Sequence, residues 1–436
     1  MGEKLYTIKD VESLSADTLV SLNQTHVNQG LTQLLTTLGC ANVFTEAEGC
    51  RIRDNLNQEY IDFIGAYGVM NVGNNNAHIL DALNRVRNKI KLVHIGINPY
   101  EAVLAHNLSK VTKDKLSRVF FCNSGSEAVE SAIKMARAAT GKSRIVYCEQ
   151  SYHGKSIGAL SVTGREYYQK AFVPIMPDTV GIPYDDLGAL EEKLKEGAGA
   201  FIVEPIQGEA GINTPSKGYL KEARRLCDTY GVLMILDEVQ TGLGRTGTFF
   251  AYEQEEIVPD ILCLAKALSG GVVPIGACLS KDDIYQKAYG SMETCMLHSS
   301  TFGGNTFACA AGIATLNYIE ENALIENCRE KGAYLLEGLQ KIKEDYYGLK
   351  EVRGKGLMLA IEFDDDENIH KRMNIPEGQL SLGTFIAVKL IREYHIITAY
   401  STNNANVIRL EPALIITKEE IDMLLNALKE LLIKKN

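Results

Sequence analysis

Short apolar runs alternate with amphipathic stretches through the middle of the chain. Runs of strand length end at Cys122, Tyr152, Glu204, Leu236 and Ala265. Stretches with a helical spacing of apolar residues lie between or before them, at 78–91, 99–111 and 219–230. Strands that alternate with helices predict β-α units, and hence an α/β fold whose mainly parallel central sheet carries helices on both faces. Ligands of such sheets bind beyond the carboxyl ends of the strands.

The pattern changes near residue 320. Long charged amphipathic helices are predicted at 324–346, 383–394 and 418–433, with strand-like segments at 353–363 and 406–415 between them. These features predict a smaller α+β C-terminal domain. Near the N-terminus, 43–63 alternates as a small meander with a turn at 54–57, and 1–36 is predicted to be an arm with one modest helix. The expected division is therefore 1–60 (part of the small domain), 61–315 and 316–436.

Composition excludes several classes of protein. The chain has 436 residues and a net charge of −10, without a long basic run, so we expect neither nucleic acid nor a membrane as a partner. No apolar run reaches the length of a membrane span, and the first ten residues form no apolar signal segment. The ten cysteines include no CxxC pair, which favours reduced thiols in a cytoplasmic protein and no metal site.

The central candidate residues are Lys266 and Asp237. Each follows an apolar run that predicts a buried strand. Burial disfavours a charged lysine, and a neutral lysine at a strand end is a suitable nucleophile for a Schiff base. A carboxylate at the end of the neighbouring strand would keep the ring nitrogen of pyridoxal 5'-phosphate (PLP) protonated. We therefore expect Lys266 to carry PLP and Asp237 to bind its ring nitrogen.

The same stretch contains a competing motif. Gly242, Gly244 and Gly247 spell G-x-G-x-x-G directly after a strand, which is typical of dinucleotide binding. That motif should open a long helix and be followed by an acid at the end of the next strand. Here the following segment soon meets Pro259, and Asp260 precedes the next strand. These glycines are therefore interpreted as a loop with positive φ angles.

A second candidate site follows the strand that ends at Cys122. The segment NSGS, at 123–126, leads into a strong helix, and the N–H groups of a helix start bind phosphate. The N–H groups of Gly125 and Ser126 and the Ser126 hydroxyl are the expected ligands. The alternative is that Ser124 or Ser126 only caps the helix, completed by a glutamate in its first turns.

Further polar and aromatic residues lie at the predicted strand ends. Tyr152 could stack on a flat cofactor, whereas His153 taken alone is more often a hydrogen-bonded core or rim residue. Glu204 ends a strand, and Glu209 lies in the loop beyond it. Tyr67, in a loop rich in glycine and asparagine, points into a pocket or packs under that loop. These residues converge on one edge of the predicted sheet.

Eight motifs taken together resemble the class III, PLP-dependent aminotransferases of fold type I. Within that family, the segments HVNQG (26–30), FCNSG, YHGKS and DILCLAKAL look most like putrescine aminotransferases, with ornithine and acetylornithine aminotransferases as near relatives. The motifs are NSGSEA (123–128), YHG (152–154), EPIQGEAG (204–211), LDEVQTGLGRTG (236–247), PDILCLAKALSGG (259–271), TFGGN (301–305), RGKG (353–356) and IRLEPAL (408–414). The G-x-G-x-x-G sequence is part of the fourth motif.

This resemblance implies a role for each matching residue. Lys266 would bind PLP and move the substrate proton, while Gln240 would bind the phenolic oxygen of the ring. Arg409 would bind a carboxylate of the oxo acid, and Glu209 would neutralise Arg409 while the amine donor is bound. Thr301 would reach the phosphate in the other subunit, which implies a homodimer. The cofactor site would comprise Ser124, Gly125, Ser126, Tyr152, His153, Glu204, Asp237, Gln240, Lys266 and Thr301, and the substrate site Tyr67, Glu209 and Arg409.

The implied activity is transfer of an amino group from a terminal amine to a 2-oxo acid. The donor would be a diamine or ω-amino acid of putrescine or ornithine type, and the acceptor 2-oxoglutarate or pyruvate, with ping-pong kinetics. The main alternative is an amino-acid racemase or aminomutase with the same cofactor. A nicotinamide-dependent dehydrogenase and a non-catalytic binding protein on the same scaffold are less favoured.

Overall fold

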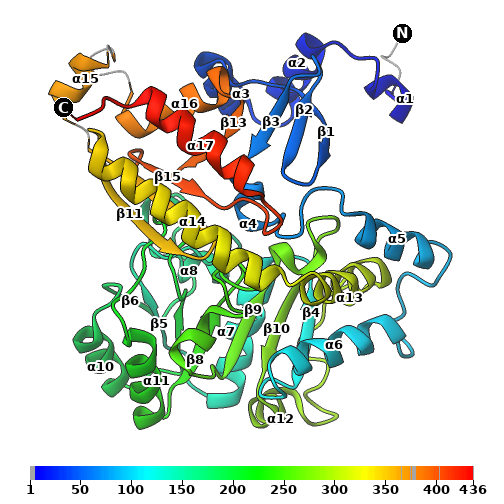
Figure 1. Cartoon of the computed structure of the whole chain (residues 1–436). Helices are drawn as coiled ribbons and strands as arrows, with labels where there is room; N and C mark the ends of the chain where they lie inside the picture. Colours follow the sequence, from blue (N-terminus) through cyan, green and yellow to red (C-terminus); the bar gives the residue numbers. More distant parts are fainter. Residues whose placement is uncertain (1–4, 365, 374, 376–379, 402, 436) are drawn as a thin grey trace.

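The structure is a computed structural model that describes residues 5–364, 366–373, 375, 380–401 and 403–435. A large sheet with its helices forms the lower body in Figure 1, and two smaller sheets with the N- and C-terminal helices lie above it. None of the described helices is both long and apolar enough to cross a membrane. All ten cysteines are free, and eight of them are buried.

The large sheet has seven strands. Four neighbouring pairs are parallel, and only β10 runs antiparallel to its two neighbours. The order is β4 (Arg118–Cys122), β10 (Gly276–Ser280), β9 (Ile261–Leu264), β8 (Leu233–Asp237), β7 (Ala200–Val203), β5 (Ile145–Cys148) and β6 (Thr179–Ile182). The predicted mainly parallel α/β sheet is confirmed.

Both faces of this sheet are buried under helices. Successive residues of β8 point to opposite faces, so Met234 and Leu236 join one apolar cluster and Ile235 joins the other. The first cluster includes side chains of α10 (Leu187–Lys195) and α11 (Tyr219–Tyr230), and the second those of α7 (Gly125–Thr140) and α12 (Asp282–Tyr289). Because neither face meets water, these strands are continuously apolar, and polar residues begin where the strands end.

The smaller sheets combine the two ends of the chain. The predicted meander is β1 (Phe44–Glu48), β2 (Arg51–Asp54) and β3 (Glu59–Asp62), and β3 pairs in parallel with β13 (Ile396–Ile397). The other sheet is antiparallel, in the order β11 (Leu349–Lys355), β12 (Met358–Phe363), β15 (Val407–Leu410) and β14 (Ala399–Tyr400). The division into 1–60, 61–315 and 316–436 stays a prediction.

Most predicted helix ends agree with the structure to within two residues, but the helix predicted at 78–91 ends five residues early, at Val86. The C-terminal helices are α14 (Leu324–Asp345), α16 (Leu382–Glu393) and α17 (Lys418–Leu431), and α13 (Thr306–Glu321) precedes them. The remaining elements are α4 (Gly65–Gly68), α5 (Ala77–Val86), α6 (Pro99–Val111), α8 (Ile157–Ser161), α9 (Glu166–Gln169), α15 (Glu367–Arg372) and the 3₁₀ helices η1 (Ala251–Glu255) and η2 (Lys266–Ser269).

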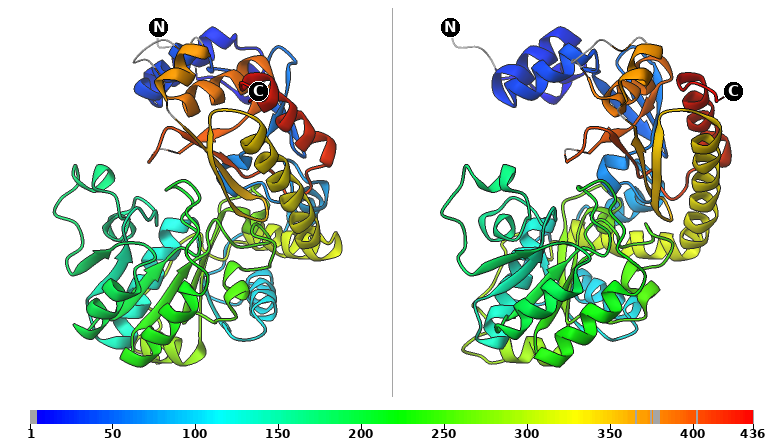
Figure 2. Two further views of the ribbon diagram at one scale, coloured as in Figure 1. Left: turned by 60° about the vertical axis from the view of Figure 1, so that its left-hand side comes forward. Right: turned by 90° about the vertical axis from the view of Figure 1, so that its left-hand side faces the viewer.

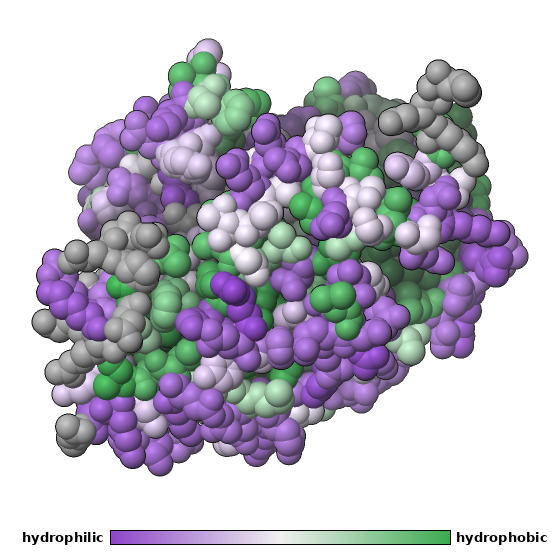
Figure 3. All heavy atoms as spheres, turned by 90° about the horizontal axis from the view of Figure 1, so that it is seen from above, coloured by the Kyte–Doolittle hydropathy of each residue, from purple (hydrophilic) through white to green (hydrophobic). Residues whose placement is uncertain are grey.

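The N-terminal arm contains more helix than the single one predicted. Its helices are α1 (Ile8–Val11), α2 (Ala16–His26) and α3 (Gln29–Leu38), and they project from the rest of the molecule in Figure 2. The Asn28 side chain accepts from the N–H of Leu31 at the start of α3, and Gly39 ends that helix in the left-handed conformation. Local capping therefore defines these helices although most of their surface is exposed. Seen from above, the upper face of the molecule is mainly hydrophilic, with hydrophobic residues exposed in several places (Figure 3).

The glycine motif after β8 forms a loop, as interpreted from the sequence. Gly244 and Gly247 have φ angles of 91° and 88°, which favour glycine, and the short helix η1 follows instead of a long one. Gly242 has a different reason to be glycine, because a Cβ there would lie 2.8 Å from the carbonyl oxygen of Glu238. The helix that a dinucleotide site requires is therefore replaced by a loop and one 3₁₀ turn.

Candidate active site

A cavity of about 480 Å³ lies at the carboxyl ends of the parallel strands. It is lined by residues that follow β4, β5, β7, β8 and β9, which is where a ligand of such a sheet binds. Ten of the thirteen predicted site residues line it: Ser124, Gly125, Ser126, Tyr152, His153, Glu204, Glu209, Asp237, Gln240 and Lys266. The sheet thus brings together residues that are up to 142 positions apart in the chain.

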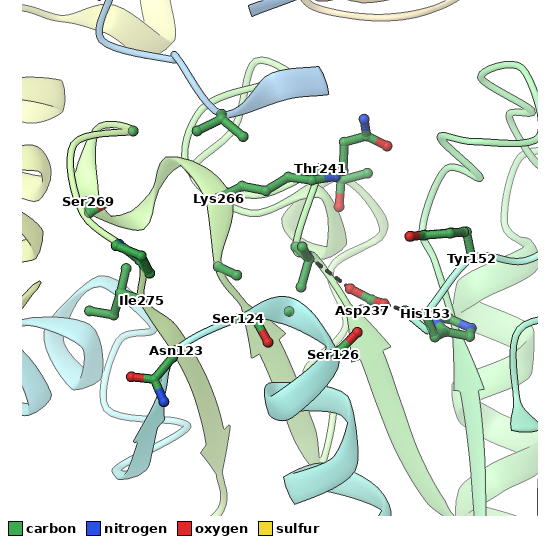
Figure 4. A pocket seen from close by; sticks show the side chains of 18 of the residues that line it. Asn123, Ser124, Ser126, Tyr152, His153, Asp237, Thr241, Lys266, Ser269 and Ile275 are labelled. Atoms are coloured by element: carbon green, nitrogen blue, oxygen red, sulfur yellow. Dashed lines mark hydrogen bonds and ion pairs between the residues drawn. The ribbon is translucent and has the colours of Figure 1, made fainter. Parts of the chain in front are cut away.

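Lys266 directly follows the apolar end of β9 and opens η2. Its φ angle is 48°, a left-handed conformation that is uncommon for a residue with a side chain. The side chain extends across the cavity (Figure 4) and has no hydrogen-bond or ion-pair partner among the described residues. Strained backbone conformations of this kind cluster at functional sites, where the surrounding structure holds them.

Asp237 is the last residue of β8 and is fixed by two contacts. Its Oδ2 lies 2.7 Å from Nδ1 of His153, and its Oδ1 accepts from the N–H of Val239 at 3.0 Å (Figure 4). Because a carboxylate only accepts, His153 donates from Nδ1. The other ring nitrogen of His153, Nε2, is buried and has no partner among the described residues. Asp237 is thus held in one orientation, at the cavity that Lys266 enters.

Glu204 ties two loops of the cavity together. Its two carboxylate oxygens accept from the N–H groups of Tyr152 at 2.8 Å and Gly208 at 3.1 Å. The pKa of Glu204 is raised to about 7, mainly by burial and also by the nearby Asp237, while His153 and the two N–H groups oppose the rise. Glu204 therefore positions the aromatic ring of Tyr152 and the loop that carries Glu209 through their backbones.

The start of α7 forms another wall of the cavity. The hydroxyl of Ser124 accepts from the N–H of Glu127 at 3.2 Å, so Ser124 caps the helix as the alternative reading expected. The N–H groups of Gly125 and Ser126 belong to the first turn and have no partner within the helix. The Ser126 hydroxyl accepts from the N–H of Lys155 at 3.1 Å. This helix start offers the unpaired donors and the positive dipole end that bind a phosphate.

Arg409 lies beside the cavity on β15 and is almost completely buried. Its Nη1 donates to Oε1 of Glu209 at 2.8 Å, which is the pair of residues that the family resemblance connected. Its guanidinium carbon lies 4.7 Å from the centre of the Tyr67 ring. Tyr67 is 45% exposed, and its backbone is left-handed with a φ angle of 62°. The ring thus lies against a cation while part of the residue remains exposed.

The structure also reveals an acid that the sequence reasoning did not single out. Glu411 is fully buried, and its two carboxylate oxygens accept from Nε2 of Gln240 at 2.9 and 3.2 Å. The same Gln240 nitrogen donates to the carbonyl oxygen of Tyr67 at 3.1 Å. Burial raises the pKa of Glu411, while Arg409, Arg245 and Lys266 oppose the rise. The sequence feature that could have identified Glu411 is its position, two residues after Arg409 and directly after the strand that carries this arginine.

Thr301 is the one predicted residue that lies away from the cavity of its own chain. It is exposed and lines a separate surface hollow with Asn123, Ser131 and His298. The Nδ2 of Asn123 donates to the hydroxyl of Ser300 at 3.0 Å. This hydrogen bond attaches the segment that carries Thr301 to the turn between β4 and α7.

A family model described as aminotransferase class-III matches residues 38–432. The chain belongs to the class III aminotransferases. It is therefore a PLP-dependent enzyme that transfers amino groups, as the motifs predicted.

Solved structures similar to this aminotransferase cover nearly its whole length. The ornithine aminotransferase from Toxoplasma gondii ME49 is 30% identical, with 98% of each chain covered and a TM-score of 0.85. The acetylornithine aminotransferase from Elizabethkingia anophelis is 30% identical, with 96% of this chain and 99% of that chain covered and a TM-score of 0.78. An amine transaminase from an uncultivated Pseudomonas species, in a PLP-bound form, is 29% identical, with 89% and 94% covered and a TM-score of 0.80.

The cavity of this aminotransferase fits PLP. It contains an unpaired lysine, a fixed carboxylate and the free N–H groups of a helix start, which match the aldehyde, the ring nitrogen and the phosphate of that cofactor. Gly154 keeps room at the phosphate end, because a Cβ there would lie 2.0 Å from the Ser126 hydroxyl. The aldehyde, the ring nitrogen and the phosphate of the cofactor therefore each have a complementary group in the cavity.

Glu204 makes the stability of the cofactor-free protein depend on pH. Its pKa is about 7 in the folded state against an ordinary value of 4.5, so between these values the folded state binds more protons than the unfolded state. The free energy of unfolding therefore falls as the pH rises from 4.5 to about 7. In Glu204→Gln this contribution is absent, and we expect the variant to gain on the order of 3 kcal/mol relative to wild type between pH 4.5 and pH 8.

Urea unfolding of the cofactor-free proteins at both pH values measures this difference. The matched control is Glu46→Gln, which removes an acid whose side chain is 71% exposed on β1. Its unfolding free energy should follow that of wild type at both pH values. Parallel pH profiles for wild type and Glu204→Gln would contradict the assigned protonation of Glu204.

Proposed function

We propose that this aminotransferase moves an amino group from the terminal amine of a diamine or ω-amino acid to a 2-oxo acid. Putrescine and ornithine represent the donor type, and 2-oxoglutarate and pyruvate the acceptor type. The observation that carries the proposal is the 2.8 Å contact between Arg409 and Glu209. An arginine that is already neutralised does not attract the carboxylate of an amino acid, whereas an oxo acid can displace Glu209 and take the guanidinium.

The contrast between the two partners supports an exchange of this kind. Arg409 is held in a strand and its side chain is 1% exposed, whereas the Glu209 side chain is 17% exposed and lies in the loop after β7. The acid is therefore the partner free to move. The relatives agree with a terminal-amine donor, since their descriptions name ornithine aminotransferase and amine transaminase.

In this proposal, a few side chains carry the chemistry. PLP, when bound, supplies an electron-withdrawing ring that makes the proton on the substrate carbon labile. Lys266 would accept that proton and return it, since its side chain extends into the cavity and has no partner among the described residues. Asp237, fixed by His153, would keep the ring nitrogen protonated, and Tyr152 would stack on the ring. Gly125 and Ser126 would bind the phosphate, and Gln240 would contact the ring oxygen.

Two substitutions separate the covalent role of Lys266 from the electrostatic role of Asp237. We expect Lys266→Ala to lose both turnover and the visible absorbance of the bound cofactor. Asp237→Asn should keep much of that absorbance but lose about 100-fold or more in kcat, because the ring nitrogen is no longer held protonated. Absorbance spectra and steady-state rates measure the two effects. Lys287→Ala, which alters an exposed lysine on α12, is the control, and turnover by Lys266→Ala would refute the mechanism.

The donor class is tested by screening amines against two acceptors. Putrescine, cadaverine, ornithine, N-acetylornithine, 4-aminobutyrate and lysine are each assayed with 2-oxoglutarate and with pyruvate. We expect the highest kcat/KM for a donor that presents a terminal amine without a carboxylate beside it. Conversion of an amino acid with no oxo acid added would instead identify a racemase or an aminomutase, and inertness of all six donors would reject the proposed donor class.

We also infer a homodimer in which Thr301 serves the site of the partner subunit. Exposed apolar side chains lie on the segment that carries Thr301 and on a second segment attached to it, and such a surface is typical of an interface. They lie on two segments that are joined by a 2.8 Å hydrogen bond from Asn98 Nδ2 to the carbonyl oxygen of Gly304. These side chains are Ile95, Ile97, Met292, Met296, Leu297 and Phe302, all more than half exposed.

Mixed dimers of Lys266→Ala and Thr301→Ala chains test this arrangement. If Thr301 acts across the interface, one site of each mixed dimer carries both substitutions and the other carries none. Half of the sites should then bind PLP with the affinity of wild type, as measured by titration of tagged and purified mixed dimers. Loss of wild-type affinity at both sites would place Thr301 in its own chain's site, and a single 48.0 kDa species in sedimentation would refute the dimer itself.

A further inference from the structure

Glu411 is a fully buried acid beside the substrate end of the cavity. It follows β15, and its N–H donates to the carbonyl oxygen of Phe63 at 2.6 Å, a contact that any residue except proline could make. The side chain is fully buried, and Gly68 leaves room for it, since a Cβ at Gly68 would lie 2.9 Å from Glu411 Oε2. A buried carboxylate is costly unless it is paired, so its partners indicate its purpose.

Its hydrogen bonds come from the amide of Gln240, and its nearest cation is Arg409, at the substrate end of the cavity. Oε1 of Glu411 lies 3.8 Å from Nη1 of Arg409, the same nitrogen that donates to Glu209. Arg245 is also fully buried. A Cβ atom placed on Gly68 would lie 3.9 Å from Nε of Arg245 and 2.9 Å from Oε2 of Glu411, so both side chains approach the same point. Arg245 has its own permanent partners in Asn71 and two carbonyl oxygens. Glu411 is thus the fixed counter-ion nearest to Arg409.

Arg409 therefore has two acids of different mobility. Glu209 is partly exposed, and its carboxylate accepts only from Arg409 among the described residues. Glu411 has no exposure and is held at both oxygens by Gln240. When an oxo acid displaces Glu209, Glu411 remains, so the guanidinium never presents its full charge to an incoming carboxylate. Nε of Arg409 has no partner among the described residues and remains available for hydrogen bonding.

We propose that Glu411 determines donor specificity by acting as a permanent second counter-ion of Arg409. It weakens the binding of carboxylates at Arg409, and so it favours donors that carry a second amine where an amino acid would carry a carboxylate. This inference rests on the proposed terminal-amine donors, but its effect on carboxylate binding can be measured without any donor. Glu411 acts through Arg409 and is a positioning residue, because no contact of its own with substrate is invoked.

The test compares variants of Glu411 in the PLP-loaded enzyme. Glu411→Gln and Glu411→Met remove the charge at similar side-chain length, whereas Glu411→Asp keeps the charge. Glu420→Gln is the matched control: Glu420 is a buried acid, 8% exposed, that pairs with Arg51 at 3.3 Å and does not contact Arg409. Glutamine also preserves the capping box in which Glu420 takes part, so this control should fold.

The first measurement is calorimetric binding of glutarate, an unreactive dicarboxylate. The dissociation constant should fall about tenfold in both neutral variants, because the charge of Arg409 is no longer partly balanced by Glu411. It should stay within about threefold of wild type in Glu411→Asp and Glu420→Gln. The second is the ratio of kcat/KM for putrescine to that for 4-aminobutyrate, which should fall about tenfold in the neutral variants. These two donors share a four-carbon chain and differ in whether it ends in an amine or a carboxylate.

The outcomes separate this inference from the proposed donor class. Unchanged glutarate affinity in either folded neutral variant would overturn the role of Glu411. Tighter glutarate binding without any putrescine turnover in wild type would support that role and reject the donor class. Equal changes in Glu411→Asp and Glu411→Gln would assign the effect to the hydrogen bonds with Gln240 and would also overturn a charge effect. Melting temperatures verify that each variant is folded.

Discussion

The active site depends on the parallel pairing of β7, β8 and β9. Each strand is buried on both faces and must be apolar along its length, so its first polar residue comes at the carboxyl end. Parallel pairing places these ends side by side, and Glu204, Asp237 and Lys266 are brought to one cavity. The register aligns Asp237 with Cys263, three residues before the lysine. A small shift of one strand would separate the amine from the carboxylate.

A second constraint is the balance of buried charge at the substrate end. Two arginines and two glutamates lie there with almost no exposure apart from Glu209. Buried ions are tolerated only when paired, so each guanidinium needs an acid or a set of fixed acceptors. Arg245 has carbonyl and amide acceptors, while Arg409 depends on carboxylates alone. The site is therefore neutral at rest, yet it holds one carboxylate that an incoming anion can replace.

Much of the site could be predicted because its determinants are local in sequence. A strand that ends in Lys266 or Asp237 and a glycine turn before a helix are short-range patterns, and the sheet edge on which they meet follows from β-α alternation. Glu411 was missed because its importance is not local. It depends on Gln240, which lies 171 positions away, and on the space at Gly68. In the N-terminal arm, one helix was predicted, whereas the ends of the helices are set by the capping side chains of Ser15 and Asn28.

The pairing of β3 with β13 has a consequence for the order of assembly. The meander strands leave the ribosome early, but β13 is synthesised more than 330 residues after β3. All seven strands of the large sheet lie between these two segments in the chain. The large sheet can therefore form during synthesis, while β3 must wait with an unpaired edge, and such edges are prone to pair wrongly. The N-terminal strands are thus the first to be made and among the last to be completed.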